Sequence, residues 1–138
     1  MISFRVSALP IAQPRQRHRI VTVNGRTFAH NYTPTKHPVN AFKAAVQLAC
    51  TQIHTGPPLE GPLRVALTFV LPRPKAMCWK TRPTPRAWQT ARPDWDNAGK
   101  SICDALSKLL WKNDTQLCDV RIRKVIAAGD EQPHAYVE

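Results

Sequence analysis

The chain has 138 residues, with 20 lysines and arginines against nine aspartates and glutamates, and a formal charge of +11. This length suits one domain with its own core, and the charge indicates a polyanionic partner, nucleic acid or an anionic membrane surface. The longest mostly apolar stretch, Val65–Leu71, is far shorter than the roughly 20 residues of a membrane-spanning helix, and no export signal is recognisable. The scattered cysteines and histidines have no zinc-ligand spacing. We therefore expect a cytoplasmic protein with free thiols that does not enter the membrane.

The first half of the chain is predicted to contain strands and one helix. Alternating apolar and polar residues over Ile2–Ala8 indicate a strand, and Pro14–Arg19 has the composition of a basic loop. Asn24-Gly25, within the β-rich segment 20–30, is typical of a two-residue hairpin turn. Apolar residues at steps of three and four predict a helix from about residue 38 to 53, with an inner face made of Val39, Phe42, Val46, Ala49 and Ile53.

The second half is predicted to contain a central strand, a long loop, a helix and two further strands. Pro62–Pro72 is almost continuously apolar, which favours a central strand covered on both faces. Arg73–Arg92 has six cations, no acid and several prolines, so we expect a long irregular loop. A helix should follow at about 97–110, with strands at 116–128 and 134–138. This order predicts an α+β (mixed α/β) fold, a single two-layer domain over residues 1–138 with a mixed β-sheet packed on two helices.

Acidic residues gather in one segment, RPDWDNAGKSICDAL (92–106), which holds three of the nine, whereas the 91 residues before it hold one. Asp94 and Asp96 flank Trp95, and in an extended segment residues two apart point to the same side. Two carboxylates would then converge just before a helix. Oxygen-rich sites of this kind suit Mg²⁺ or Mn²⁺.

The same residues also have a purely structural explanation. An aspartate at a helix start caps the helix and favours its dipole. Asp96, Lys100 and Asp104 follow at steps of four on one helical face, which is the spacing of ordinary surface ion pairs. The net charge favours a functional role, because carboxylates in a phosphate-binding face repel the ligand unless a divalent cation lies between them. Metal-dependent phosphodiester hydrolysis uses this arrangement, with a cation such as Lys100 to neutralise charge on the phosphate.

This segment, followed by WKNDTQLCDVRIRK (111–124), resembles the signature of the RusA family of Holliday junction resolvases. The shared pattern is Asp-x-Asp-Asn, a lysine four residues after the second Asp, Asp-Ala-Leu, then Trp, an acidic pair, Gln and a basic strand. The rest of the chain agrees loosely, so the resemblance extends over its whole length.

The resemblance implies a homodimeric endonuclease that nicks four-way DNA junctions and depends on Mg²⁺, with Mn²⁺ as a substitute. It implies that Asp94, Asp96 and Asp114 bind metal and act in catalysis, and that Lys100 is the essential basic residue. The family usually has two adjacent acids where this chain has Asn113-Asp114, so Asn113 is an uncharged further candidate. Asp104 also matches the motif, with a structural role as an equal alternative.

The position of Asp114 raises a geometric difficulty. A helix over 97–110 is about 20 Å long, and Asp114 leaves its far end, whereas the metals of a two-metal site lie about 4 Å apart. Three arrangements solve this: the chain doubles back after Trp111, the helix is shorter, or a second protomer supplies Asp114.

Two basic segments are predicted to contact DNA phosphates. The first supplies Arg15, Arg17 and Arg19, and the second supplies Arg73, Lys75, Lys80, Arg82, Arg86 and Arg92. An aromatic side chain of Trp79 or Trp88 could pack on exposed bases at a branch point. For each of these two alone, packing against the domain is the preferred expectation, and Trp95 and Trp111 are expected to pack in the core or at its rim. No recognition-helix motif is present, so we expect DNA shape rather than base sequence to govern binding.

The leading hypothesis is a structure-selective, Mg²⁺-dependent endonuclease that resolves Holliday junctions by paired symmetric nicks in recombination and repair. Two symmetric cuts require two sites, which a two-fold homodimer provides. The alternatives are a non-catalytic basic module that binds branched DNA and a nuclease that acts mainly on flaps and forks. The resemblance and small size favour a bacterial host and a phage or prophage origin.

Overall fold

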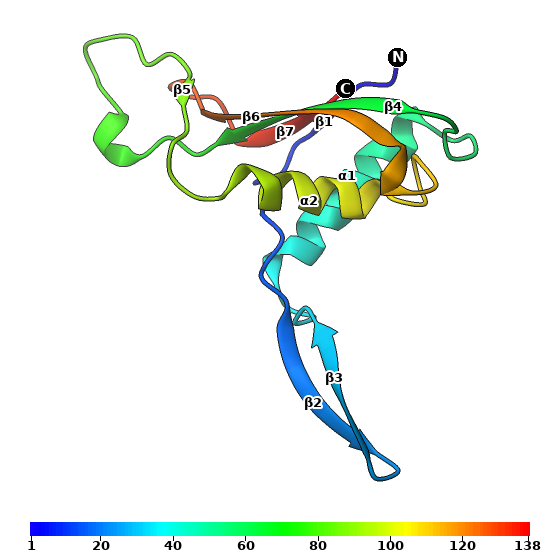
Figure 1. Cartoon of the computed structure of the whole chain (residues 1–138). Helices are drawn as coiled ribbons and strands as arrows, with labels where there is room; N and C mark the ends of the chain where they lie inside the picture. Colours follow the sequence, from blue (N-terminus) through cyan, green and yellow to red (C-terminus); the bar gives the residue numbers. More distant parts are fainter.

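A computed structural model describes all 138 residues (Figure 1). A five-stranded sheet has the strand order β1-β7-β4-β6-β5, with β4 and β6 parallel and the other neighbours antiparallel. Both helices cover the same face of this sheet (Figure 1). The strands are β1 (Phe4–Val6), β4 (Leu63–Leu71), β5 (Ala87–Trp88), β6 (Leu117–Ile126) and β7 (His134–Val137). The predicted α+β architecture, with a mixed sheet and two helices in two layers, is confirmed.

Strand β4 lies in the middle of the sheet, as predicted. Its odd-numbered residues, such as Leu67 and Phe69, are buried in the core beneath the helices. Its even-numbered residues Arg64 and Thr68 are less buried, and no helix covers that face (Figure 1). The expectation of cover on both faces is therefore wrong for most of the strand, because the apolar run conceals an alternation, and it holds only near the end of the strand, where Val70 is fully buried.

Helix α1 (Pro38–Ile53) begins and ends where the sequence predicts. Nδ1 of His37 accepts a hydrogen bond from the backbone N–H of Val39 at 3.1 Å, and this caps the first turn. The inner face includes Cys50 in place of the expected Ile53, whose side chain is 58% exposed.

Helix α2 (Trp95–Leu106) starts two residues earlier and ends four residues earlier than predicted. Asp94 has extended backbone (φ −66°, ψ 144°) and stands at the N-cap position. Beyond the helix, Lys108 adopts a left-handed conformation (φ 67°) that turns the chain away. A short 3₁₀ helix, η2 (Asp114–Gln116), then leads into β6.

A separate two-stranded hairpin, β2 (Arg17–Val23) and β3 (Arg26–Tyr32), extends away from the sheet and helices (Figure 1). Asn24 (φ 52°) and Gly25 (φ 74°) both have the positive φ that a type I′ turn requires, so the predicted hairpin is confirmed. The strands are longer than expected. Arg17 and Arg19 consequently belong to β2 and not to a loop.

The segment 73–92 is more ordered than the predicted irregular loop. It contains a 3₁₀ helix, η1 (Lys75–Met77), and β5, which pairs with the end of β6. Arg73 donates hydrogen bonds to three carbonyl oxygens, those of Met77 (2.8 Å), Pro85 (2.8 Å) and Ala127 (3.1 Å).

Neither α1 nor α2 combines the length and apolar character needed to span a membrane.

Candidate active site

Asp94 and Asp96 lie at the start of α2, with exposed side chains. The carboxylate of Asp94 makes no capping hydrogen bond, and neither residue takes part in an ion pair. Capping and surface pairing therefore do not account for these acids, whereas Asp96, in the first turn, does favour the helix dipole. Asp96 is in the first helical turn, so the predicted extended arrangement of the two residues is wrong at this position.

Lys100 and Asp104 follow on α2 and have different surroundings. Lys100 is exposed and forms no ion pair, so the expected ladder of charges along the helix is not formed. Asp104 lies 3.5 Å from Nζ of Lys43 on α1. Nearby, Nε2 of Gln47 donates to the carbonyl of Ala105 at 3.1 Å. Asp104 thus helps to join the two helices, which favours the structural alternative for this residue.

A hollow of about 660 Å³ lies beside Asp94. The backbone N–H of Gln13 donates to the carbonyl of Asn97 at 2.9 Å and holds the N-terminal segment against the start of α2. Arg15 and Arg92, one from each predicted basic segment, line the hollow together with Asp94. Residues some 80 positions apart are therefore brought to one place, with two cations next to one carboxylate.

Strand β6 fixes the chain immediately before Asp94. Nζ of Lys124 donates to the carbonyls of Ala91 (3.0 Å) and Pro93 (2.5 Å). An ammonium that donates to two backbone oxygens restrains the loop that leads into the acidic segment. The predicted basic strand thus includes Lys124, whose ammonium binds the backbone just before Asp94.

Asp114 lies near the other end of α2. Its Oδ1 accepts a hydrogen bond from Nε1 of the buried Trp111 at 2.7 Å. Burial, together with the negative charges of Asp114 and Asp104, raises the pKa of the Cys103 thiol to about 11. Asp114 therefore lies close to the C-terminal half of the helix.

The course of β6 explains why Asp114 lies far from Asp94 and Asp96, at the other end of α2. The strand starts just after η2 and passes beneath Gly99, where Ile122 contacts the helix, before it reaches the loop held by Lys124. Two of the arrangements considered for Asp114 are present, since the chain doubles back and the helix is shorter than predicted. Neither brings Asp114 to the start of α2, because Asp114 comes before the strand that returns. Twelve helical residues span about 18 Å. No group of three His, Cys, Asp or Glu side chains in the chain could hold a metal ion, so one protomer does not gather all three predicted metal ligands.

Asn113 caps η2. Its Oδ1 accepts from the N–H of Thr115 at 3.1 Å, while Oε1 of Gln116 accepts from the N–H of Asn113 at 3.0 Å. Nε2 of Gln116 also donates to the carbonyls of Leu59 and Gly61, both at 3.0 Å. The oxygen of Asn113 is engaged in this capping box, which the spacing of Asn and Gln in the sequence could have indicated.

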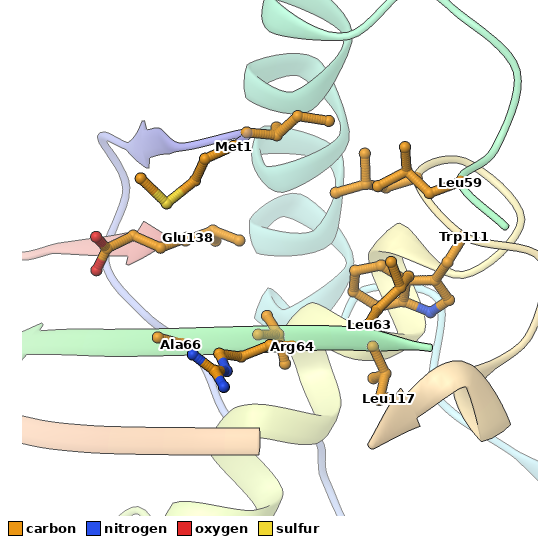
Figure 2. Close-up of a pocket in the computed structure, with 12 residues that line it drawn as sticks. Met1, Leu59, Leu63, Arg64, Ala66, Trp111, Leu117 and Glu138 are labelled. Atoms are coloured by element: carbon orange, nitrogen blue, oxygen red, sulfur yellow. The ribbon is translucent and has the colours of Figure 1, made fainter. Parts of the chain in front are cut away.

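A second hollow, of about 490 Å³ and mostly apolar, lies at the start of β4 (Figure 2). Leu59, Leu63, Trp111 and Leu117 form one side of it, with Met1 and Glu138 opposite (Figure 2). Neither Asp94 nor Asp96 reaches it. Its link to the acidic residues runs through Trp111, which lines the hollow and binds Asp114.

The cations of the segment 73–92 fall into two groups. Arg73 binds backbone carbonyls, and Arg86 forms an ion pair with Glu131. Lys75, Lys80, Arg82 and Arg92 are exposed and form no ion pair. The guanidinium of Arg82 also lies 3.8 Å from the ring centroid of Trp79.

The tryptophans only partly follow the prediction that all of them pack. Trp111 is buried, with 2% of its surface exposed. Trp88 and Trp95 are 71% and 62% exposed, so the expectation is wrong for these two. Trp95 stands between Asp94 and Asp96 in the chain, so exposed aromatic surface lies next to the acidic residues.

The chain is similar to known proteins over nearly its whole length. The chain is 29% identical to the uncharacterized protein YqaN of Bacillus subtilis (strain 168), in an alignment that covers 99% of this chain and 93% of YqaN. Residues 10–138 match the protein family described as Endodeoxyribonuclease RusA. The match includes the acidic segment, both basic segments and the hairpin. The chain therefore belongs to the RusA family of endodeoxyribonucleases.

Proposed function

We propose that this protein resolves four-way DNA junctions by paired symmetric nicks, as a metal-dependent homodimer in the bacterial cytoplasm. The observation that carries the proposal is the pair of exposed carboxylates of Asp94 and Asp96. Neither carboxylate forms an ion pair, and Asp94 lines a hollow together with Arg15 and Arg92. Free oxygen donors next to phosphate-binding cations fit a hard divalent cation.

Each residue has a distinct role in this proposal. Asp94 and Asp96 hold Mg²⁺ or Mn²⁺, which supplies an activated water and stabilises charge on the phosphate. Arg15 and Arg92 hold the DNA strand beside these carboxylates. Lys100, exposed one helical turn after Asp96, neutralises the negative charge that develops on the scissile phosphate.

Asp114 completes the proposed site from a second protomer. Within one chain it lies toward the far end of α2, whereas a two-fold dimer can bring the start of one helix to the end of its partner's. A dimer also supplies the two sites that paired cuts require. Arg17, Arg19, Lys75, Lys80 and Arg82 are the remaining exposed cations that we assign to DNA contact. Arg73 and Arg86 contribute mainly by shaping the loop.

The test compares cleavage of labelled four-way, flap and duplex DNA with Mg²⁺ and with a chelator. We expect the four-way junction to be cut fastest, and Asp94→Asn or Asp96→Asn to abolish the cut while junction binding survives. Asp104→Asn is the matched control, because this acid pairs with Lys43 and should not be needed for cleavage. Junction binding without nicks would favour a non-catalytic module, and faster cleavage of flaps would favour the fork nuclease. Full cleavage by both mutants would remove the site assignment.

A further inference from the structure

The hairpin β2–β3 has no partner within the protein. Its strands pair only with each other, and nearly every residue on both faces is exposed. Exposed side chains include large apolar ones, with Ile20 76% and Phe28 50% exposed. An isolated two-stranded hairpin is marginally stable in water, so an external partner would stabilise this one.

The two faces of the hairpin differ in chemistry. Residues directly opposite each other in an antiparallel pair share a face. One face, here called the arginine face, consists of the pairs Arg17–Tyr32, Arg19–His30, Val21–Phe28 and Val23–Arg26. The other, the neutral face, consists of the pairs His18–Asn31, Ile20–Ala29 and Thr22–Thr27.

Polar groups on the neutral face bind one another, whereas the arginines have no partner. His18 and Asn31 are hydrogen-bonded at 2.6 Å, and Thr22 and Thr27 at 3.1 Å. No arginine of the hairpin forms an ion pair. The first 59 residues contain no acid at all. The arginine face therefore presents three guanidinium groups whose partners must come from another molecule.

We propose that the hairpin is an arm that binds duplex DNA through its arginine face. The charge decides the type of partner, because unpaired guanidinium groups in a segment without acids suit the phosphates of a polyanion. A two-stranded ribbon is of a size that the major groove admits. Strands of seven residues span about 24 Å, or about seven base pairs.

The arm continues the phosphate path that starts at the acidic site. Arg15 lines the hollow beside Asp94, and β2 begins two residues later and leads away from the body (Figure 1). The arm therefore contacts a duplex arm of the substrate outside the cleaved position. The choice of branched DNA as the substrate rests on the proposed function. The arm adds to that function by binding and orienting the DNA, and it takes no part in the chemical step.

The test compares two variants with the same net charge. Arg19→Gln/Arg26→Gln changes the arginine face, and Ile20→Glu/Thr27→Glu changes the neutral face, and each lowers the formal charge from +11 to +9. Binding to a labelled four-way junction and to a linear duplex is measured across a salt series without divalent metal. We expect the first variant to lose affinity for both DNAs and to reduce the slope of log K against log salt by about 2. The second variant should keep the wild-type slope, and Arg19→Lys/Arg26→Lys should keep most of the affinity.

Each outcome decides for or against the arm. Equal losses in the two charge-matched variants would mean that net charge alone matters, and would overturn the proposal. A variant of the arginine face that alters the oligomeric state in sedimentation, with an unchanged salt slope, would reassign the hairpin to protein contact. Thermal melting checks that the variants are folded, since the hairpin lies outside the core.

Cleavage is measured separately, so the two proposals can fail independently. If the wild type binds DNA but makes no nick with Mg²⁺, the resolvase proposal fails, and the two charge-matched variants alone decide for or against the arm. If the wild type nicks junctions while the arginine-face variant binds as the wild type does, the arm fails and the resolvase proposal stands. A wild type that binds no DNA would overturn both.

Discussion

A Cβ atom on Gly99 would lie 2.5 Å from Cδ1 of Ile122, so either the helix or the end of the Ile122 side chain would have to shift. Helix α2 therefore rests on β6 at a distance that depends on the missing side chain of Gly99. Gly99 lies three residues after Asp96 and one before Lys100, so the helix contacts the sheet in the same part of α2 that carries these two side chains.

Gly99 and Ile122 are predicted to be energetically coupled. Gly99→Ala gains about 1 kcal/mol of helix propensity and loses about 1–3 kcal/mol to overpacking, so we expect a net loss of about 1 kcal/mol. Ile122→Val removes the clashing Cδ1 atom and alone costs about 0.5–1.5 kcal/mol. The double mutant should be about as stable as the wild type. The measurement is the free energy of unfolding in urea, and additivity within about 0.5 kcal/mol would contradict the coupling.

Lys124→Met is predicted to slow cleavage without loss of DNA binding. The change keeps the aliphatic chain but removes the ammonium that binds the carbonyls of Ala91 and Pro93. Asp94 would then be held less firmly, and small displacements of reacting groups cost up to about 100-fold in rate. We expect kcat on a four-way junction to fall at least about tenfold with little change in affinity. Arg123→Gln, at the exposed neighbouring position, is the control, and a comparable drop in its kcat would argue against a positioning role for Lys124.

The ion pair of Arg86 with Glu131 is predicted to stabilise the fold above acid pH. The hydrogen bonds from Arg86 lower the pKa of Glu131 to about 2, against a usual value near 4.5. A lowered folded-state pKa means that the stabilisation is complete above about pH 4.5 and is lost as the pH falls toward 2. Because the pair is partly solvated, we expect Glu131→Gln to cost about 1 kcal/mol at pH 6 and almost nothing at pH 2.

Urea unfolding at the two pH values measures this difference. Asp130→Asn, at the exposed neighbour that forms no ion pair, is the control. A constant deficit of Glu131→Gln from pH 6 to pH 2 would show that the ionised pair is not the source of the stability.

A mixed dimer tests whether Asp114 acts in the partner's site. One copy carries Asp94→Asn and the other carries Asp114→Asn, and differently tagged copies allow the mixed species to be purified. If Asp114 acts across the dimer, both lesions fall in one site and the other stays intact. We therefore expect single nicks at about half the wild-type nicking rate, as in a dimer of Asp94→Asn with wild type. An inactive mixed dimer, with that reference dimer active, would place Asp114 in the site of its own chain.

The sequence predicted those features that depend on local pattern. Helix α1 has a proline at its start and apolar residues at helical spacing, so both of its ends were predictable. Asn24-Gly25 marked the hairpin turn by itself, because few other residue pairs accept two positive φ angles. The central position of β4 followed from its apolar content, although its alternation was overlooked.

Features that depend on distant contacts were not predictable in this way. The start of α2 at Trp95 and its end at Leu106 were both missed, the latter because Lys108 turns the chain in a conformation that lysine rarely adopts. Arg73 and Arg86 lie in a segment whose composition predicts DNA binding. The structure shows instead that Arg73 donates a hydrogen bond to the carbonyl of Ala127 and that Arg86 forms an ion pair with Glu131, both from a distant part of the chain. Such hydrogen bonds and ion pairs between distant residues can be identified only when the three-dimensional structure is known.

The sheet ends on β1 and β5, which have three and two residues. β5 pairs only with the last residues of β6, so most of the outer edge of this ten-residue strand keeps its outward backbone groups unpaired. A free edge can accept a strand from another molecule, whereas charged side chains on the edge strand oppose such pairing. β6 carries Asp119, Arg121 and Arg123 along this stretch, so charge, and not a short length, protects this edge against aggregation.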